Sequence, residues 1–251
     1  NIRALEVDGT FDDCQKLVKT AFLDEELNKQ VNLSSANSIN IARLIPQSFY
    51  YFYAFQQLEN WDDVIVAVPS GNYGNMTAGL LAWKMGLPIK RFIASSNANR
   101  VVPDYLLSGK YDPKPSIRTY ANAMDVGAPS NFVRMLELFG GDFEQVTSVI
   151  SGYCLVDEGI LQVMATCAKE RDYILDPHGA IGYQALVENL EEGEQGIFLE
   201  TAHPVKFLDV VEKALGQAPD YKTKIADLLE KESSFEQIGG GYEEFREIFL
   251  R

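Results

Sequence analysis

The sequence predicts an α/β fold, an open, twisted and mostly parallel sheet with helices on both faces. Along most of the chain, apolar runs of strand length alternate with segments of helical periodicity, a pattern typical of βα units. The 251 residues, 46% of them apolar, are enough for a sizeable core in one or two domains. A sheet of parallel strands joined by crossover helices follows from this alternation.

Short apolar runs mark the expected strands, which fall at residues 3–7, 64–68, 91–95, 152–156, 173–175 and 197–200. The first helix begins after Thr10, whose hydroxyl can accept an unpaired first-turn N–H, and runs to about Phe22. A second helix, 38–58, is rich in aromatic residues on more than one face, which predicts burial on several sides. The other expected helices are 76–85, 131–139, 157–171, 180–190 and 204–215, with peripheral helices at 220–232 and 242–249.

The excess of acidic residues argues against some classes of binding partner. Lys and Arg total 22 against 36 Asp and Glu, a formal net charge of −14, which argues against nucleic acid or a polybasic membrane surface. No apolar run approaches the ~20 residues of a membrane span, and the first residues lack a secretory signal pattern. His178 and His203 belong to no metal-binding spacing, so we expect no metal site. We expect a cytoplasmic protein.

The most informative motif joins the strand at 64–68 to the helix at 76–85. The intervening residues read Pro-Ser-Gly-Asn-Tyr-Gly-Asn, so Gly71, Asn72, Tyr73, Gly74 and Asn75 lie between a buried strand and a helix N-terminus. Glycines allow the backbone to approach an anion closely, and the free N–H groups and dipole of a helix start favour phosphate. The loop therefore predicts a site for one phosphate monoester; the alternative is a tight turn.

A second strand-to-helix junction carries the sequence Leu-Glu-Thr-Ala-His-Pro. Thr201 would lie at the carboxyl end of a strand, where open α/β sheets bind ligands, and its hydroxyl could hydrogen-bond a ring nitrogen. The alternative role is a cap of the helix that begins at Pro204.

A third polar segment, residues 34–43, opens the aromatic helix. Ser35, Asn37, Asn40 and Arg43 are candidate contacts for an anionic substrate. The alternative is a capped helix with a surface arginine.

These three segments, together with Met-Asp-Val-Gly-Ala-Pro-Ser-Asn-Phe at 124–132 and Asp-Pro-His-Gly-Ala at 176–180, resemble threonine synthase in the same order over roughly residues 1–215. The resemblance implies a pyridoxal 5'-phosphate (PLP) enzyme of fold type II, the tryptophan-synthase-β-like fold, truncated at the N-terminus. It implies that residues 71–75 hold the cofactor phosphate and that Thr201 meets the pyridine nitrogen. It further implies that residues 1–55 are the remainder of a small domain with its return helix. Residues 56–251 would then be the large PLP-binding domain with peripheral C-terminal helices.

The catalytic lysine is the main departure from the family pattern. The family carries its Schiff-base lysine in a Ser-Phe-Lys-Asp-type motif upstream of the phosphate loop, and no lysine in this sequence has that context. The resemblance implies that the intact protein converts O-phospho-L-homoserine and water to L-threonine and phosphate, and that the 251-residue chain alone is inactive. The alternatives are a serine/threonine dehydratase-like enzyme of the same fold, or a non-catalytic homologue that binds a phosphorylated ligand.

Overall fold

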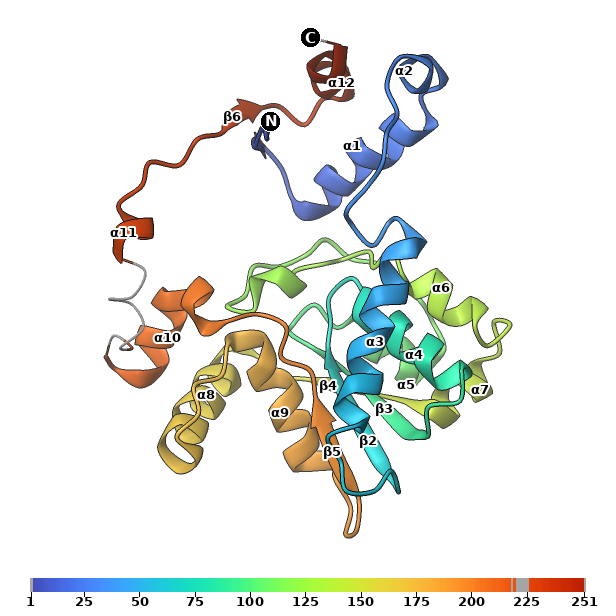
Figure 1. Cartoon of the computed structure of the whole chain (residues 1–251), viewed down its shortest axis with the longest axis vertical. Helices are drawn as coiled ribbons and strands as arrows, with labels where there is room; N and C mark the ends of the chain where they lie inside the picture. Colours follow the sequence, from blue (N-terminus) through green and yellow to red (C-terminus); the bar gives the residue numbers. More distant parts are fainter. Residues whose placement is uncertain (1, 218, 220–225, 251) are drawn as a thin grey trace. The chain divides into compact units, whose positions relative to one another are not determined.

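The computed structural model describes residues 2–217, 219 and 226–250. The chain forms two compact units, which are described separately (Figure 1). Unit 1 combines Asn1–Ala36 with Lys224–Arg251, and unit 2 is Asn37–Thr223. Among the described residues, no helix is long and apolar enough to cross a membrane.

A parallel sheet of four strands forms the centre of unit 2. The strands run in the order β4-β3-β2-β5, and each neighbouring pair is parallel. The prediction of a mostly parallel sheet is therefore confirmed. The strand bounds are β2 (Val64–Pro69), β3 (Ile89–Ser96), β4 (Ile150–Cys154) and β5 (Gln195–Phe198).

Helices cover both faces of this sheet (Figure 1). Every residue of β2 is buried, and successive side chains point to opposite faces of the sheet. Val64, Val66 and Val68 join the core on the side of α3 and α4, whereas Ile65 and Ala67 pack against α9. A strand that is apolar at every position thus indicates a sheet whose two faces are both buried.

The helices of unit 2 follow the predicted segments closely in most places. The helix at 157–171 is confirmed at both ends, while α5 and α7 lay outside the sequence predictions. The bounds are η1 (Ile41–Arg43), α3 (Leu44–Phe55), α4 (Gly74–Lys84), α5 (Val101–Ser108), η2 (Asn122–Met124), α6 (Phe132–Glu137), α7 (Phe143–Val149), α8 (Asp157–Arg171), α9 (Pro177–Asn189), η3 (Pro204–Phe207) and α10 (Leu208–Leu215).

Two predictions for unit 2 are wrong, one entirely and one in part. Residues 173–175 form no strand; they lead from α8 to Asp176, the N-cap of α9. The helix expected from residue 38 begins only at Ile41, because asparagine side chains hold the preceding backbone in turns. Asn37 Oδ1 accepts the Ile39 N–H at 3.2 Å, and Asn40 Oδ1 accepts the Ala42 N–H at 3.1 Å.

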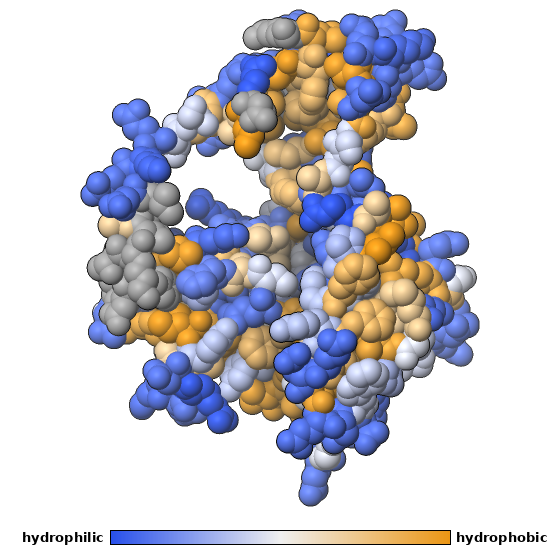
Figure 2. Space-filling model, in the orientation of Figure 1, coloured by the Kyte–Doolittle hydropathy of each residue, from blue (hydrophilic) through white to orange (hydrophobic). Residues whose placement is uncertain are grey.

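The aromatic helix α3 has one buried and one exposed face. Tyr51 and Phe55 are buried, and the Tyr51 hydroxyl donates to the Asn75 carbonyl oxygen at 2.6 Å. Phe49 and Tyr53, four residues apart, are 61% and 66% exposed, so the expectation of burial on several sides is wrong for them. Figure 2 shows that apolar side chains share the viewed surface with polar ones.

Unit 1 is built on a two-stranded parallel sheet that pairs the two ends of the chain. Strand β1 (Leu5–Val7) pairs with β6 (Glu236–Ile238). Thr10 caps the first helix, as predicted, and Asp13 completes a capping box. The helices of the unit are α1 (Phe11–Leu23), α2 (Glu25–Gln30), α11 (Ala226–Leu229) and α12 (Tyr242–Leu250).

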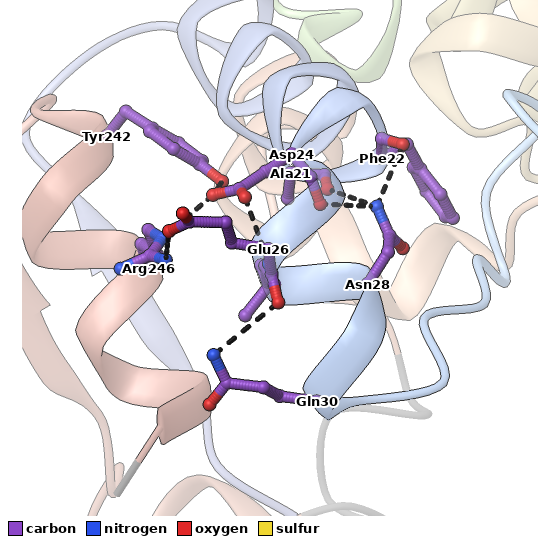
Figure 3. A network of polar contacts seen from close by, with 9 residues as sticks. Ala21, Phe22, Asp24, Glu26, Asn28, Gln30, Tyr242 and Arg246 are labelled. Atoms are coloured by element: carbon purple, nitrogen blue, oxygen red, sulfur yellow. Dashed lines mark hydrogen bonds and ion pairs between the residues drawn. The ribbon is translucent and has the colours of Figure 1, made fainter.

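Asp24 ties the junction of α1 and α2 to α12 (Figure 3). Its carboxylate accepts the Leu27 N–H at 2.9 Å, the Tyr242 hydroxyl at 2.7 Å and the Arg246 Nε–H at 2.8 Å. The Leu27 N–H, followed by the Tyr242 hydroxyl and Arg246, lowers the pKa of Asp24 to about 2. The C-terminal helix is therefore held to the start of the chain by an ionised carboxylate.

The two units do not divide the chain at the predicted domain boundary between residues 55 and 56. Helix α3 packs with α4 in unit 2, because Tyr51 is buried against it, and the C-terminal segment joins unit 1 through β6. Of the helix predicted at 220–232, residues 220–225 lie outside the described residues, and 226–229 are helical.

Candidate functional site

A cavity of about 350 Å³ lies at the carboxyl end of β2, within unit 2. Its position follows the rule that open parallel sheets bind ligands beyond the carboxyl ends of their strands. The cavity brings together all six residues predicted to contact a cofactor. The lining residues are Ser38, Gln47, Tyr50, Pro69, Ser70, Gly71, Asn72, Tyr73, Gly74, Asn75, Ala123, Met124, His178, Thr201 and Ala202.

Side chains of the loop itself fix the backbone between β2 and α4. The Ser70 hydroxyl donates to Asn75 Oδ1 and accepts the Tyr73 N–H at 3.0 Å. Asn75 Nδ2 donates to the Pro69 carbonyl at 2.9 Å, and its Oδ1 accepts the Met76 N–H at 2.9 Å. The loop is therefore a preformed turn rather than a flexible connection.

Tyr73 holds a left-handed conformation, with φ of 60°, immediately before α4. This conformation costs a residue other than glycine on the order of 1–3 kcal/mol unless its surroundings enforce it. The Tyr73 side chain is buried, and its hydroxyl shares a hydrogen bond of 2.6 Å with Ser96 Oγ at the end of β3. Burial raises the pKa of Tyr73, so the phenol is neutral near pH 7.

Four backbone amides of this loop are available to a ligand. Within the described part of the chain, the N–H groups of Gly71, Asn72, Gly74 and Asn75 donate to no protein acceptor. Gly74 and Asn75 belong to the first turn of α4, where the helix dipole is positive. A single phosphate group is the ligand that this set of donors suits best.

A second layer of polar side chains supports the loop from residues 130–134. Asn72 Oδ1 accepts the Ser130 N–H at 2.6 Å and the Ser130 hydroxyl at 2.9 Å. Asn131, which is fully buried, donates through Nδ2 to the Asn72 carbonyl and to Ser38 Oγ, both at 3.0 Å. Arg134 donates to the Ser38 carbonyl at 2.5 Å and the Ile39 carbonyl at 2.6 Å. These contacts join the segment at 38–39 to the loop.

Of the predicted substrate residues in unit 2, Asn37, Asn40 and Arg43 are not among those that line the cavity. Asn37 and Asn40 support turns of the segment before α3, and Arg43 follows in η1. Ser35 belongs to unit 1. Ser38, from the same motif, does line the cavity and was not selected from the sequence, although the motif contains it.

Thr201 lines the cavity one residue after Glu200, just beyond β5. It does not cap the following helical turn. That role belongs to His203, whose Nδ1 accepts the Val205 N–H at 3.1 Å. The alternative role of Thr201 as a helix cap is therefore wrong, and the residue lines the cavity at the carboxyl end of the sheet.

His178 also lines the cavity and is almost fully buried. Its Nδ1 lies 2.7 Å from Asp176 Oδ1, and its Nε2 accepts the Ala123 N–H at 3.2 Å. Its contact with Ala123, 55 residues away in the sequence, could not be predicted from a local pattern. In the described residues, no group of three His, Cys, Asp or Glu side chains could hold a metal ion.

Two known protein families match this sequence and together cover most of the chain. The family described as "Pyridoxal-phosphate dependent enzyme" matches residues 2–199, and the one described as "Threonine synthase, C-terminal" matches residues 179–248. A threonine synthase from Haemophilus influenzae is 50% identical over 218 residues, which are 86% of this chain and 51% of that protein. The chain spans about half the length of the curated relatives it matches.

Solved structures agree with the sequence matches. The crystal structure of threonine synthase from Escherichia coli matches with a TM-score of 0.93 and 43% identity, over 99% of this chain and 58% of that one. The structure of PLP-bound threonine synthase from Brucella melitensis matches with a TM-score of 0.84 and 33% identity, over 99% of this chain and 59% of that one. The fold is therefore that of fold type II PLP enzymes.

Proposed function

Because the chain belongs to the threonine synthase family of PLP-dependent enzymes, we propose that the intact protein converts O-phospho-L-homoserine and water to L-threonine and phosphate. The proposal rests on one observation above all: the Ser-Gly-Asn-Tyr-Gly-Asn loop and Thr201 form one cavity at the carboxyl end of the sheet. Its place in the cell would be the cytoplasm.

The residues present fit the phosphate group of PLP. The amides of Gly71, Asn72, Gly74 and Asn75 would hold its oxygens, since none of them donates to a protein acceptor in the described chain. The formal net charge of −14 disfavours the binding of anions in general. The backbone N–H groups and the positive end of the α4 dipole provide the local attraction that a phosphate group needs. When bound, PLP supplies an electron sink for a substrate carbanion.

Thr201 would meet the pyridine nitrogen of the cofactor. A hydroxyl is neutral and can donate to an unprotonated ring nitrogen, whereas a carboxylate at the same place would favour the protonated ring. Ser35, Asn37, Asn40 and Arg43 remain our proposed substrate contacts, with Ser38 added because it lines the cavity. Unit 2 would form most of the PLP-binding domain.

The test compares the intact protein with the 251-residue chain. We expect the intact protein to release phosphate and form threonine from O-phosphohomoserine in equal amounts, and the chain alone to do neither. Deamination of serine or threonine by the intact protein, without turnover of phosphohomoserine, would move the assignment to the dehydratase relatives.

Substitution of Thr201 in the intact protein tests its proposed place. Thr201→Asp should retain PLP and lose most threonine formation, because the carboxylate favours protonation of the ring nitrogen. Thr201→Ser is the matched control and should have a milder effect, since the hydroxyl remains. Near-normal threonine formation by the Asp variant would remove Thr201 from the cofactor site.

A further inference from the structure

Asp176 presents a buried oxygen atom that the rest of the described structure leaves without a partner. The residue caps α9 and is 0% exposed. Its Oδ1 accepts the His178 N–H at 2.8 Å and contacts His178 Nδ1 at 2.7 Å. Its Oδ2 is buried and has no hydrogen-bond partner in the described residues. A buried carboxylate oxygen in this state needs a donor.

The Glu200 carboxyl group contacts the same residue through its backbone. Its Oε1 accepts the Asp176 N–H at 3.1 Å, and its Oε2 accepts the Tyr173 hydroxyl at 2.5 Å. A Cβ at Gly179 would lie 2.8 Å from Oε1, so the carboxyl group is packed closely against the first turn of α9. In the described part of the chain, neither Asp176 nor Glu200 forms an ion pair with a lysine or arginine.

Two carboxyl groups in this arrangement favour a single negative charge over two. Burial, and then the charge of Asp176 and a side-chain hydrogen bond with it, raises the pKa of Glu200, although Tyr173 and the Asp176 N–H lower it. Cys167 of α8 also faces Glu200; its own pKa is raised, first by burial, so the thiol adds no charge.

We infer that Glu200 and Asp176 share one proton, which supplies the missing donor at Asp176 Oδ2 and leaves the residue before Thr201 uncharged. The hydrogen bonds then run without interruption from the exposed Tyr173 through Glu200 and Asp176 to His178, at the wall of the cavity. Glu200 acts through its neighbours and is a positioning residue.

The directions of its hydrogen bonds fix the tautomer of His178. Nε2 accepts the Ala123 N–H, so a neutral ring carries its hydrogen on Nδ1, which then donates to Asp176 Oδ1. The other histidine of the chain provides a built-in contrast. His203 Nδ1 accepts the Val205 N–H, so its neutral ring carries the hydrogen on Nε2.

The consequence for the cofactor rests on the proposed function. Glu200 directly precedes Thr201 in the sequence. An ionised carboxylate there would favour a protonated pyridine nitrogen, whereas the neutral Thr201 hydroxyl suits an unprotonated one. Sharing the proton with Asp176 directs the remaining charge toward His178. The tests below use the 251-residue chain without cofactor or substrate, so their failure would leave the proposed function standing.

The first test is the stability of Glu200→Gln as a function of pH. Glutamine has the shape of a protonated glutamate and can donate to Asp176 Oδ2. In the folded wild type, the pKa of Glu200 is raised above its ordinary value of 4.5. Glu200 therefore stabilises the folded chain fully below pH 4.5, and this stabilisation is lost as pH rises through the folded pKa. Gln does not titrate, so the variant lacks this pH dependence. The ratio of the wild-type unfolding constant to that of the variant should therefore rise with pH, by at most about tenfold for each unit between the folded and unfolded pKa of Glu200.

Glu194→Gln is the matched control in the same unit. Burial raises the pKa of Glu194, but the Glu191 N–H, Arg91 and Lys90 lower it to about 2. Its side chain pairs with Arg91 at 2.8 Å and Lys90 at 3.1 Å, so this glutamate is ionised and Gln should destabilise the protein at pH 7. Both tryptophans, Trp61 and Trp83, lie in unit 2 and report its unfolding. A Glu200→Gln variant that is destabilised equally at every pH would overturn the shared proton.

The second test reads the two histidine rings directly. Nitrogen-15 NMR of the two histidine rings, assigned with His203→Gln, should show a neutral Nδ1–H form for His178 and an Nε2–H form for His203. The form of His178 should persist in Glu200→Gln. An Nε2–H form of His178 in the wild-type chain would refute the inferred direction of the hydrogen bonds.

Discussion

Gly71→Ala should destabilise unit 2 because the backbone of another segment occupies the space of a side chain. A Cβ at Gly71 would lie 2.5 Å from the Met124 Cα and 2.8 Å from its carbonyl oxygen. Ordinary contacts of a Cβ fall at 3.4–4 Å, so one of the two segments must move by about 1 Å. Gly71 and Met124 both line the cavity, so the movement would also change its shape.

The expected cost of this overpacking is about 1–3 kcal/mol. For a folding unit of 150–250 residues, each kcal/mol lowers the Tm by roughly 2–4 °C, which gives a loss of roughly 2–12 °C. Tryptophan fluorescence during thermal or urea unfolding of the 251-residue chain measures it, since Trp61 and Trp83 lie in unit 2.

Gly74→Ala is the matched comparison in the same loop. Its Cβ would meet the Ser38 Cβ at 3.0 Å, a longer contact than the 2.5 Å at Gly71, and alanine favours the first turn of α4 by up to about 1 kcal/mol. We therefore expect the smaller loss for Gly74→Ala. A Gly71→Ala variant as stable as the wild type, or less affected than Gly74→Ala, would refute the close packing of the loop on Met124.

Three further outcomes are expected. Tyr73→Phe should cost about 1–3 kcal/mol in urea unfolding, because it leaves the buried Ser96 hydroxyl without its partner; a loss that varied between pH 6 and 8 would contradict a neutral phenol. Asp24→Asn should lower the stability of unit 1 at pH 7. The depressed pKa of Asp24 gives stability that is complete above its unfolded value and is lost as pH falls through the folded value of about 2, so the gap to the wild type should close as pH falls from about 4 toward 2. Hydrogen exchange of the α12 amides measures this gap, and a gap independent of pH would exclude an ionised Asp24. Borohydride treatment of the 251-residue chain with PLP, followed by peptide mapping, should label no lysine stoichiometrically, and a single labelled lysine would show that the catalytic lysine is present after all.

Local patterns in the sequence were sufficient for the central part of the fold and for the cofactor loop. The buried run 64–68 predicted a strand covered on both faces, and β2 shows it. The loop from Ser70 to Asn75 could be recognised because its turns are made by its own side chains, within five residues of one another. The parallel order of the sheet followed from the alternation of strands and helices, since parallel strands require long crossovers.

Contacts between distant residues decided the rest. The short segment 173–175 has the composition of a strand, but it gains no strand partner, and only packing reveals that Tyr173 reaches Glu200 instead. The division into units depends on the pairing of β1 with β6 at opposite ends of the chain, which no local pattern encodes.

The support of the site is likewise a product of the tertiary structure. Asn131 contacts the Asn72 carbonyl from 59 residues away, and Asp176 meets Glu200 across 24 residues. Hydrogen bonds of this kind depend on the distance and angle between two elements, which the sequence specifies only through the packing of the whole core. The sequence by itself therefore determined which residues form the loop and the strands. The tertiary structure alone decided which side chains hold the loop in place and which carboxyl groups meet beside it.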